Sequence, residues 1–169
     1  VLKEGDIVSL DAGVYYKGFH TDAARTYAVG KVSPELQTLM EATEQSFYKG
    51  MLQARVGNRI SDISHAVEEY IKPFGYGIVR DFTGHGVGFE LHEDPAIPNY
   101  GKPGRGVRIQ EGMTLAIEPM ITLGSGDVEI LSDGWTTVTR DGSYAAHYEN
   151  TVAVVDGSPV ILTAPDVSI

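Results

Sequence analysis

Residues 7–29 of the chain read IVSLDAGVYYKGFHTDAARTYAV. Both ends of this stretch are mostly apolar or β-branched, and Lys17-Gly18 lies between them. Two strand-like runs joined by a short turn that contains Gly predict a β-hairpin. Facing side chains on paired strands approach to about 5 Å. We therefore expect Asp11 and Asp22 to lie together on adjacent strands, where a cation between them would relieve their repulsion; an ordinary pair of turn carboxylates is the alternative.

The segments after the hairpin predict helices first and short strands later. Ser33-Pro34 is typical of a helix start, and we expect that helix to end at Gly57. A second helix is expected from about Ser61 to Pro73. Beyond it, short strands alternate with Gly-containing turns, with longer strands expected at 114–121 and 144–154. The pattern predicts one α+β domain over residues 1–169, with an antiparallel-rich, curved sheet and helices on its outer face.

The composition restricts the classes of partner. The chain has 169 residues, of which 42% are hydrophobic, and it has no long apolar run that predicts a membrane span. Its 23 acidic and 13 basic residues give a formal charge of −10, which disfavours direct nucleic-acid binding. It has no Cys and therefore no disulfides, and we expect it in the cytoplasm.

Two histidines follow in glycine- and turn-rich surroundings. His85 lies in Gly84-His85-Gly86-Val87-Gly88, where small neighbours leave the imidazole open to a ligand. His92 lies in Leu91-His92-Glu93-Asp94-Pro95 and is placed to hydrogen-bond a substrate carbonyl. A structural His in a turn and an exposed loop His remain the alternatives. His20 and His147 are left without a role, and His65 is expected to be solvated.

Two glutamates interrupt apolar segments. Glu118 lies in Leu115-Ala116-Ile117-Glu118-Pro119-Met120, and Glu149 precedes the β-branched residues Thr151 and Val152. A buried carboxylate without a partner costs several kcal/mol, so it needs a cation, a hydrogen-bond network or a raised pKa. A metal-ligand role is the stronger interpretation for both.

Asp11, Asp22, His85, Glu118 and Glu149 together give four carboxylates and one imidazole. This donor set suits hard or borderline divalent metals, whereas soft metals prefer thiolates. Its chemistry is hydrolysis by a metal-activated water.

In this order, the motifs resemble the methionine aminopeptidase family of the bacterial type, which has the pita-bread fold. The resemblance extends from Lys3 to about Leu162 and rests on these stretches: 5–11, 18–22, 83–88, 92–95, 112–120, 133–135 and 148–151. It implies a dinuclear metalloenzyme that removes the initiator methionine from nascent proteins or peptides when the second residue is small. Ribosome association would then be transient.

The resemblance also implies a role for each residue. Asp11 and Asp22 would chelate one ion, Asp22 and Glu149 would bridge two, and His85 with Glu118 would complete the second site. The ions would be of the Co, Mn, Fe, Zn or Ni class. Glu118 would move protons as a catalytic group, His92 would contact the substrate near the scissile carbonyl, and Trp135 would form a wall of the methionine pocket.

Two alternatives remain open. Xaa-Pro aminopeptidases and prolidases share the fold and the five ligands, although they usually carry Arg just before the last Glu, where His147-Tyr148 stand here. The chain also lacks the N-terminal segment of the family, so we expect a fragment of a longer protein. An inactive, metal-binding fragment or a pure binding module is the second alternative.

Overall fold

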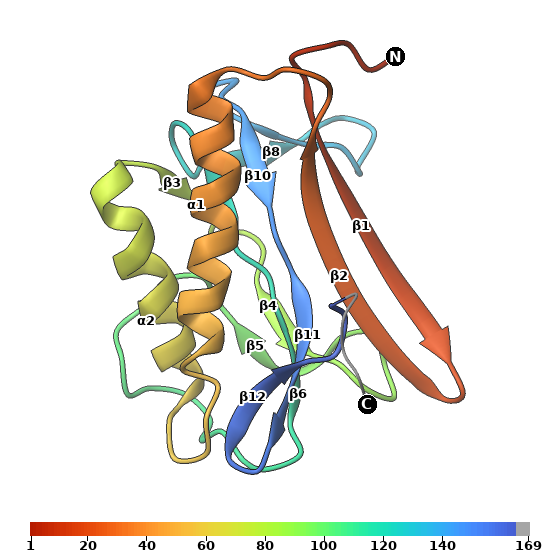
Figure 1. Cartoon of the computed structure of the whole chain (residues 1–169), viewed down its shortest axis with the longest axis vertical. Helices are drawn as coiled ribbons and strands as arrows, with labels where there is room; N and C mark the ends of the chain where they lie inside the picture. The colour runs from red at the N-terminus through yellow and green to blue at the C-terminus, as the bar shows by residue number, and fades with distance from the viewer. Residues whose placement is uncertain (165–169) are drawn as a thin grey trace.

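The structure is a computed structural model and describes residues 1–164. Two helices lie side by side on one side of the molecule, and a long hairpin extends on the other (Figure 1). The strands of the described residues are β1 (Ile7–Tyr16), β2 (Phe19–Ala28), β3 (Gly77–Ile78), β4 (Gly84–Gly86), β5 (Glu93–Ile97), β6 (Thr114–Ile117), β7 (Met120–Thr122), β8 (Val128–Ile130), β9 (Thr137–Thr139), β10 (Ala145–His147), β11 (Asn150–Val155) and β12 (Ser158–Ile161).

The helices are α1 (Pro34–Met51) and α2 (Ile60–Ile71), and a short 3-10 helix η1 (Lys72–Phe74) follows α2. The Ser33 side chain caps α1 by accepting a hydrogen bond from the backbone N–H of Leu36, which confirms the predicted start. The predicted end at Gly57 is wrong. Backbone bonds from Gln53 and Ala54 back to the last turn tighten the chain there, before Gly57 is reached.

The strands pair antiparallel throughout the described residues. A five-stranded sheet has the order β12-β11-β6-β4-β5, and a three-stranded sheet has the order β10-β7-β3. The hairpins β1-β2 and β8-β9 form two further sheets. The α+β fold with an antiparallel-rich sheet and helices on one face is confirmed.

One antiparallel ladder of backbone pairs continues from the three-stranded sheet into the five-stranded sheet, and it is interrupted at Glu118 and Glu149. His147 pairs with Met120 on one side of the gap, and Asn150 pairs with Ile117 on the other, so the register is the same on both sides. The expected strands 114–121 and 144–154 are therefore each split in two, which corrects the sequence prediction. Pro119 lacks a backbone N–H, so the ladder cannot run unbroken through it.

The helices bury an apolar face against both sheets. Leu36, Leu39 and Phe47 of α1 recur at helical spacing and are buried. Leu36 and Leu39 pack with Ile121 of the three-stranded sheet, whereas Phe47 packs with residues of the five-stranded sheet. The helix α1 therefore holds the two sheets together across the gap in the ladder. None of the helices within residues 1–164 combines the length and the apolar character that crossing a membrane requires.

Candidate metal centre

The hairpin β1-β2 carries the first two carboxylates. Asp11 pairs with Ala24, and Asp22 pairs with Gly13, so the two Asp residues are diagonal neighbours rather than directly facing as predicted. Their paired positions differ by two residues, and side chains two residues apart lie on the same face of a sheet. One carboxylate oxygen of Asp11, one of Asp22 and one of Glu149 lie within 4.8 Å of one another.

His85 lies in β4, between β5 and β6 in the five-stranded sheet, and is buried. The segment 84–88 was expected to be a turn, and its first three residues are instead a strand. A Cβ atom on Gly84 would collide with the carbonyl oxygen of Ala116, and one on Gly86 would collide with that of Asp94. The glycines therefore allow close strand packing, which differs from the open access predicted from the sequence.

The His85 ring is oriented by a hydrogen bond at its Nδ1, which lies 2.8 Å from the carbonyl oxygen of Gly86. Because a carbonyl only accepts, Nδ1 carries the proton and donates it. The Nε2 atom is then unprotonated and free to bind a metal, with the ring fixed by the bond on its other side.

Gly86→Ala is expected to lower the free energy of unfolding by about 2 kcal/mol or more, because the added methyl meets backbone that cannot move aside cheaply. Urea unfolding of the variant measures this change. Gly134→Ala is a useful comparison in open space, although its positive φ adds backbone strain. Equal unfolding midpoints for Gly86→Ala and the unaltered chain would contradict the packing role.

Glu118 and Glu149 lie in the gap of the ladder, Glu118 directly after β6 and Glu149 directly before β11. Glu149 is 1% exposed, and its backbone N–H donates to the carbonyl of Ala24, which ties it to the hairpin. The carbonyl of Glu118 accepts a hydrogen bond from the Asn99 side chain at 2.9 Å. The interruption of the strands thus turns both carboxylates toward the hairpin.

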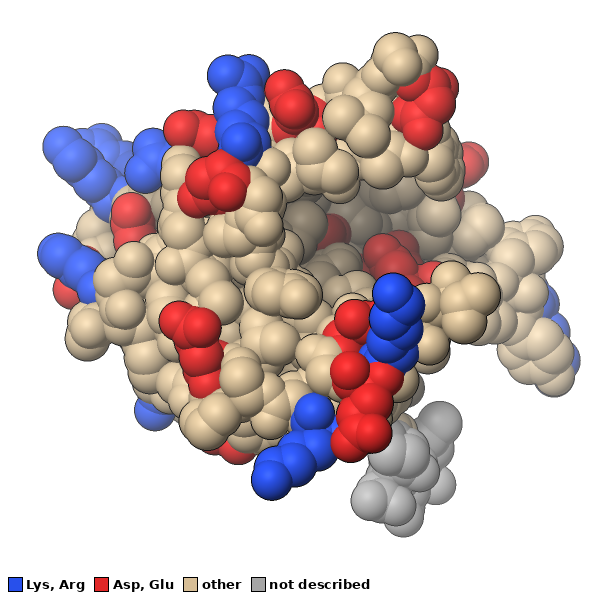
Figure 2. All heavy atoms as spheres, turned by 90° about the horizontal axis from the view of Figure 1, so that it is seen from above, with Lys and Arg blue, Asp and Glu red and all other residues tan. Residues whose placement is uncertain are grey.

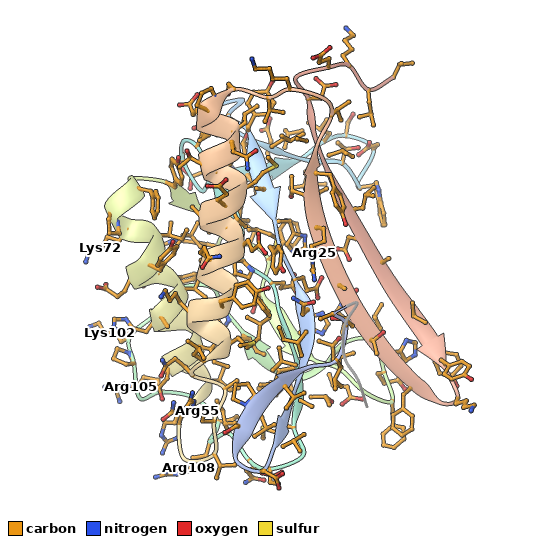
Figure 3. All side chains as sticks on the ribbon, viewed as in Figure 1. Arg25, Arg55, Lys72, Lys102, Arg105 and Arg108 are labelled. Atoms are coloured by element: carbon orange, nitrogen blue, oxygen red, sulfur yellow. The ribbon has the colours of Figure 1, made fainter. Side chains whose placement is uncertain are left out.

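Arg25 of β2 holds the segment around Glu149 in place. Its guanidinium donates to the carbonyls of Ala24 and Glu149 and to the Asn150 side chain, and it lies 4.0 Å from the centre of the Tyr148 ring. Figure 3 shows Arg25 beside β2, toward the centre of the molecule. The other labelled basic side chains lie along the edge of the molecule opposite the β1-β2 hairpin. Arg25 therefore fixes the Glu149 backbone from the hairpin.

The potential ligands form three overlapping groups, each with donor atoms within 4.8 Å of one another: Asp11, Asp22 and Glu149; His85, Glu118 and Glu149; and Asp22, His85 and His92. The structure thus brings together all five predicted metal ligands. They line a cavity of about 280 Å³ with His92, Asp81, Phe82 and Thr83. Figure 2 shows a hollow on one face of the molecule with acidic side chains inside it.

Three carboxylates of the cavity, those of Asp22, Glu118 and Glu149, hold their protons unusually strongly. Burial, followed by repulsion from Asp11 and Asp22, raises the pKa of Glu118 to about 8. Burial and repulsion from Glu118, Asp22 and Asp11 raise the pKa of Glu149 to about 9. Burial and Asp11 also raise the pKa of Asp22. Such a concentration of buried negative charge favours a cation as its counter-charge.

One buried atom supports the fit of a divalent cation directly. Oε1 of Glu149 is enclosed and makes no hydrogen bond within the described residues. Buried polar atoms are almost always satisfied, so an atom that has no partner needs an explanation. A divalent cation with mixed oxygen and imidazole donors satisfies this oxygen and neutralises its neighbours.

The two remaining predicted residues lie in different places. The His92 ring centre lies 4.4 Å from that of His85, so His92 borders the ligands, as its predicted substrate contact requires. Trp135 lies in the turn between β8 and β9, is 88% exposed, and is absent from the residues that line the carboxylate cavity. Its role in substrate binding stays a prediction.

His147 belongs to the site although the sequence prediction gave it no role. It is largely buried, and its Nε2 lies 3.7 Å from Oε2 of Glu118. Burial lowers the pKa of His147. Its position directly before the Tyr148-Glu149 segment was the available signal. His65, in contrast, was expected to be solvated and is half-buried, with Nδ1 3.2 Å from the Gly101 carbonyl.

The model of the protein family described as Metallopeptidase family M24 matches residues 1–156. The chain belongs to this family. A methionine aminopeptidase of Clostridium acetobutylicum is 56% identical to this M24 chain over 163 residues, a match that covers 96% of the chain. The chain spans 65% of the length of that relative.

Solved structures give the same family. The methionine aminopeptidase of Thermotoga maritima has a TM-score of 0.94 and 48% identity. The match covers 96% of the M24 chain and 66% of the Thermotoga maritima protein. A prolidase of Pyrococcus furiosus has a TM-score of 0.75 and 26% identity, and the match covers 96% of the M24 chain and 42% of the prolidase. The resemblance to methionine aminopeptidases and the pita-bread fold are confirmed, and the family is one of metallopeptidases, in accord with the acidic donor set.

Proposed function

We propose that this chain carries the metal centre of a methionine aminopeptidase that binds two divalent ions. The observation that supports two ions is the sharing of Glu149 between two groups of ligands, one with Asp11 and Asp22 and the other with His85 and Glu118. A residue that belongs to both groups is suited to bridge two neighbouring ions. When bound, such ions would polarise a scissile carbonyl and lower the pKa of a water molecule.

The side chains of the site have separate tasks in this proposal. Glu118 accepts the proton of the attacking water at a carboxylate oxygen and passes it to the leaving amine. His92 donates a hydrogen bond to the substrate oxygen on which negative charge develops.

An apolar pocket beside the metal centre supports a thioether side chain in the substrate. This pocket has a volume of about 210 Å³, and its lining includes Val79, Met120 and Val138. Phe82 lines both this pocket and the carboxylate cavity. An unbranched, apolar residue such as methionine fits such a lining. Trp135 is proposed as a further wall of the methionine pocket.

The proposed substrates are peptides and nascent chains whose initiator methionine precedes a small residue, encountered in the cytoplasm with transient ribosome association. The names of the relatives support removal of an N-terminal methionine. The prolidase alternative is less favoured, because identity falls from 56% with a methionine aminopeptidase to 26% with a prolidase. A Xaa-Pro dipeptide assay separates the two.

Hydrolysis of Met-Ala-Ser in the presence of Mn²⁺ tests the proposal, and Glu118→Ala and Asp11→Ala are each expected to lower kcat/KM by at least about 1,000-fold. The loss follows because each variant removes a carboxylate of the metal centre, and Glu118→Ala removes the proton acceptor as well. Chromatography of the two products, methionine and Ala-Ser, measures turnover. Near-normal activity in either variant would exclude the assignment. Mn²⁺ binding by the unaltered chain without turnover would instead support the inactive fragment.

A further inference from the structure

His147 has a feature that the proposed mechanism leaves unused. Its Nε2 is enclosed by protein and has no hydrogen-bond partner within the described residues. Leaving a buried polar atom without a partner destabilises the fold, so a compensating interaction is expected. Oε2 of Glu118, at 3.7 Å, is the ionisable group paired with this nitrogen.

The backbone of His147 is held in one position. Its N–H donates to the Thr26 hydroxyl at 2.8 Å, and the same hydroxyl lies 2.9 Å from its carbonyl. The residue also pairs with Met120 in the ladder between β10 and β7. The strand and the Thr26 contact together fix the backbone from which the imidazole extends toward Glu118, and that side chain is largely buried.

The Glu118 carboxylate lies between two imidazoles. Oε1 is 3.3 Å from Nε2 of His85, and Oε2 is 3.7 Å from Nε2 of His147. His85 uses its Nδ1 for the Gly86 carbonyl and presents Nε2 as a metal ligand. The oxygen near His85 is thus the one placed for a shared ion, and the other oxygen faces His147.

We propose that His147 is a positioning residue that donates a hydrogen bond from Nε2 to Oε2 of Glu118 and so turns Oε1 toward the metal. A small rotation of either side chain brings the two atoms from 3.7 Å to hydrogen-bond distance. Without this contact the carboxylate rotates freely and loses its alignment with His85. This inference rests on the proposed role of Glu118 as a metal ligand.

Four forms of the chain test the proposal: the unaltered chain, His147→Gln, His147→Asn and His147→Leu. The amide nitrogen of Gln is the same number of bonds from Cα as Nε2 of His, so it reaches Glu118. The amide nitrogen of Asn is shorter by one bond and corresponds to Nδ1. Leu retains the apolar contacts but cannot donate.

Isothermal titration with Mn²⁺ at fixed pH is the measurement, with thermal unfolding of each metal-free variant as a check of folding. We expect His147→Gln to bind Mn²⁺ within about threefold of the unaltered chain. His147→Asn and His147→Leu are expected to bind about 10- to 100-fold more weakly, which is the usual effect of removing a group that orients a metal ligand. His65→Leu, which removes a histidine from α2, is the matched control for nonspecific binding to imidazole.

Each contrary result has a defined meaning. Unchanged affinity in His147→Leu would overturn the proposal, as would a His147→Gln variant as weak as His147→Leu. Loss of a whole binding equivalent in His147→Leu would make His147 a direct ligand, which also overturns a positioning role. If the unaltered chain fails to bind Mn²⁺, the proposed metal centre itself is wrong, so the two failures are distinguishable.

Discussion

Asp22→Asn is expected to weaken Mn²⁺ binding by about 100-fold or more while leaving the metal-free fold at least as stable as before. Asp22 belongs to two of the three ligand groups, one with Asp11 and Glu149 and one with His85 and His92. Changes to groups that merely orient ligands cost about 10- to 100-fold in metal affinity, so loss of a shared ligand should reach at least the upper end.

The second half of this expectation follows from burial. Desolvation and the neighbouring Asp11 raise the pKa of Asp22, which means that its charge is unfavourable in the metal-free protein. Asn is neutral and nearly the same shape, and its side-chain oxygen still accepts the hydrogen bond that Oδ1 takes from the N–H of Ala23. Removing an uncompensated charge from such a place is neutral or stabilising.

Titration calorimetry with Mn²⁺ and thermal unfolding in EDTA measure the two halves separately. Asp81→Asn makes the same change of charge in the same cavity, outside all three ligand groups, and is expected to alter affinity by no more than about threefold. An Asp22→Asn chain that keeps tight binding would remove Asp22 from the metal centre. One that unfolds at a much lower temperature would show that Asp22 stabilises the fold through contacts of its own.

The sequence identifies the candidate ligands that the fold brings together, but it does not predict their geometry. Asp11 and Asp22 flank a recognisable turn, and Glu118 stands out because apolar residues surround it. These signals are local, and a few neighbouring residues suffice to read them. The same holds for the start of α1, where the Ser33 side chain makes the predicted cap.

Features that depend on distant partners could not be predicted in the same way. The register of β1 against β2, which places Asp11 diagonally from Asp22, depends on how the Lys17-Gly18 turn closes. The apolar runs around Glu118 and Glu149 read as continuous strands, because nothing local shows that they face each other across a gap in one ladder. Pro119 indicates that its strand is interrupted, but it does not indicate which segment of the chain pairs with that strand.

The role of the glycines beside His85 was hidden for a related reason. A Gly-rich segment is typical of a turn, and the close approach of β5 and β6 that excludes side chains at Gly84 and Gly86 involves residues far along the chain. His147 shows the same limit. Its importance arises from the position of Glu118 on another strand, which only the folded chain reveals.

The metal-free chain is expected to lose stability as the pH rises from about 6 to 9, and Mn²⁺ is expected to displace protons when it binds. The pKa of Glu118 is about 8 and that of Glu149 is about 9, against an ordinary value of 4.5, so the folded state binds more protons than the unfolded state between these limits. Stability falls with pH wherever the folded state holds the additional protons. The stabilising contribution of the two groups is therefore complete below pH 4.5, falls progressively above it, and is gone once the pH has passed through 8 and 9. Thermal unfolding in EDTA across this range measures the loss.

Metal binding reverses the preference of both groups, because carboxylate ligands must be deprotonated. At pH 6 both Glu118 and Glu149 hold their protons, so we expect Mn²⁺ to release about two protons per chain, and fewer at pH 8, where Glu118 is half ionised. Affinity should rise over the same interval. Calorimetry in buffers with different ionisation enthalpies counts the released protons, and Glu118→Gln, which has no proton to lose, should release about one. Binding without proton release at pH 6 would mean that the two glutamates are already ionised in the metal-free site, so that burial and mutual repulsion do not control their charge.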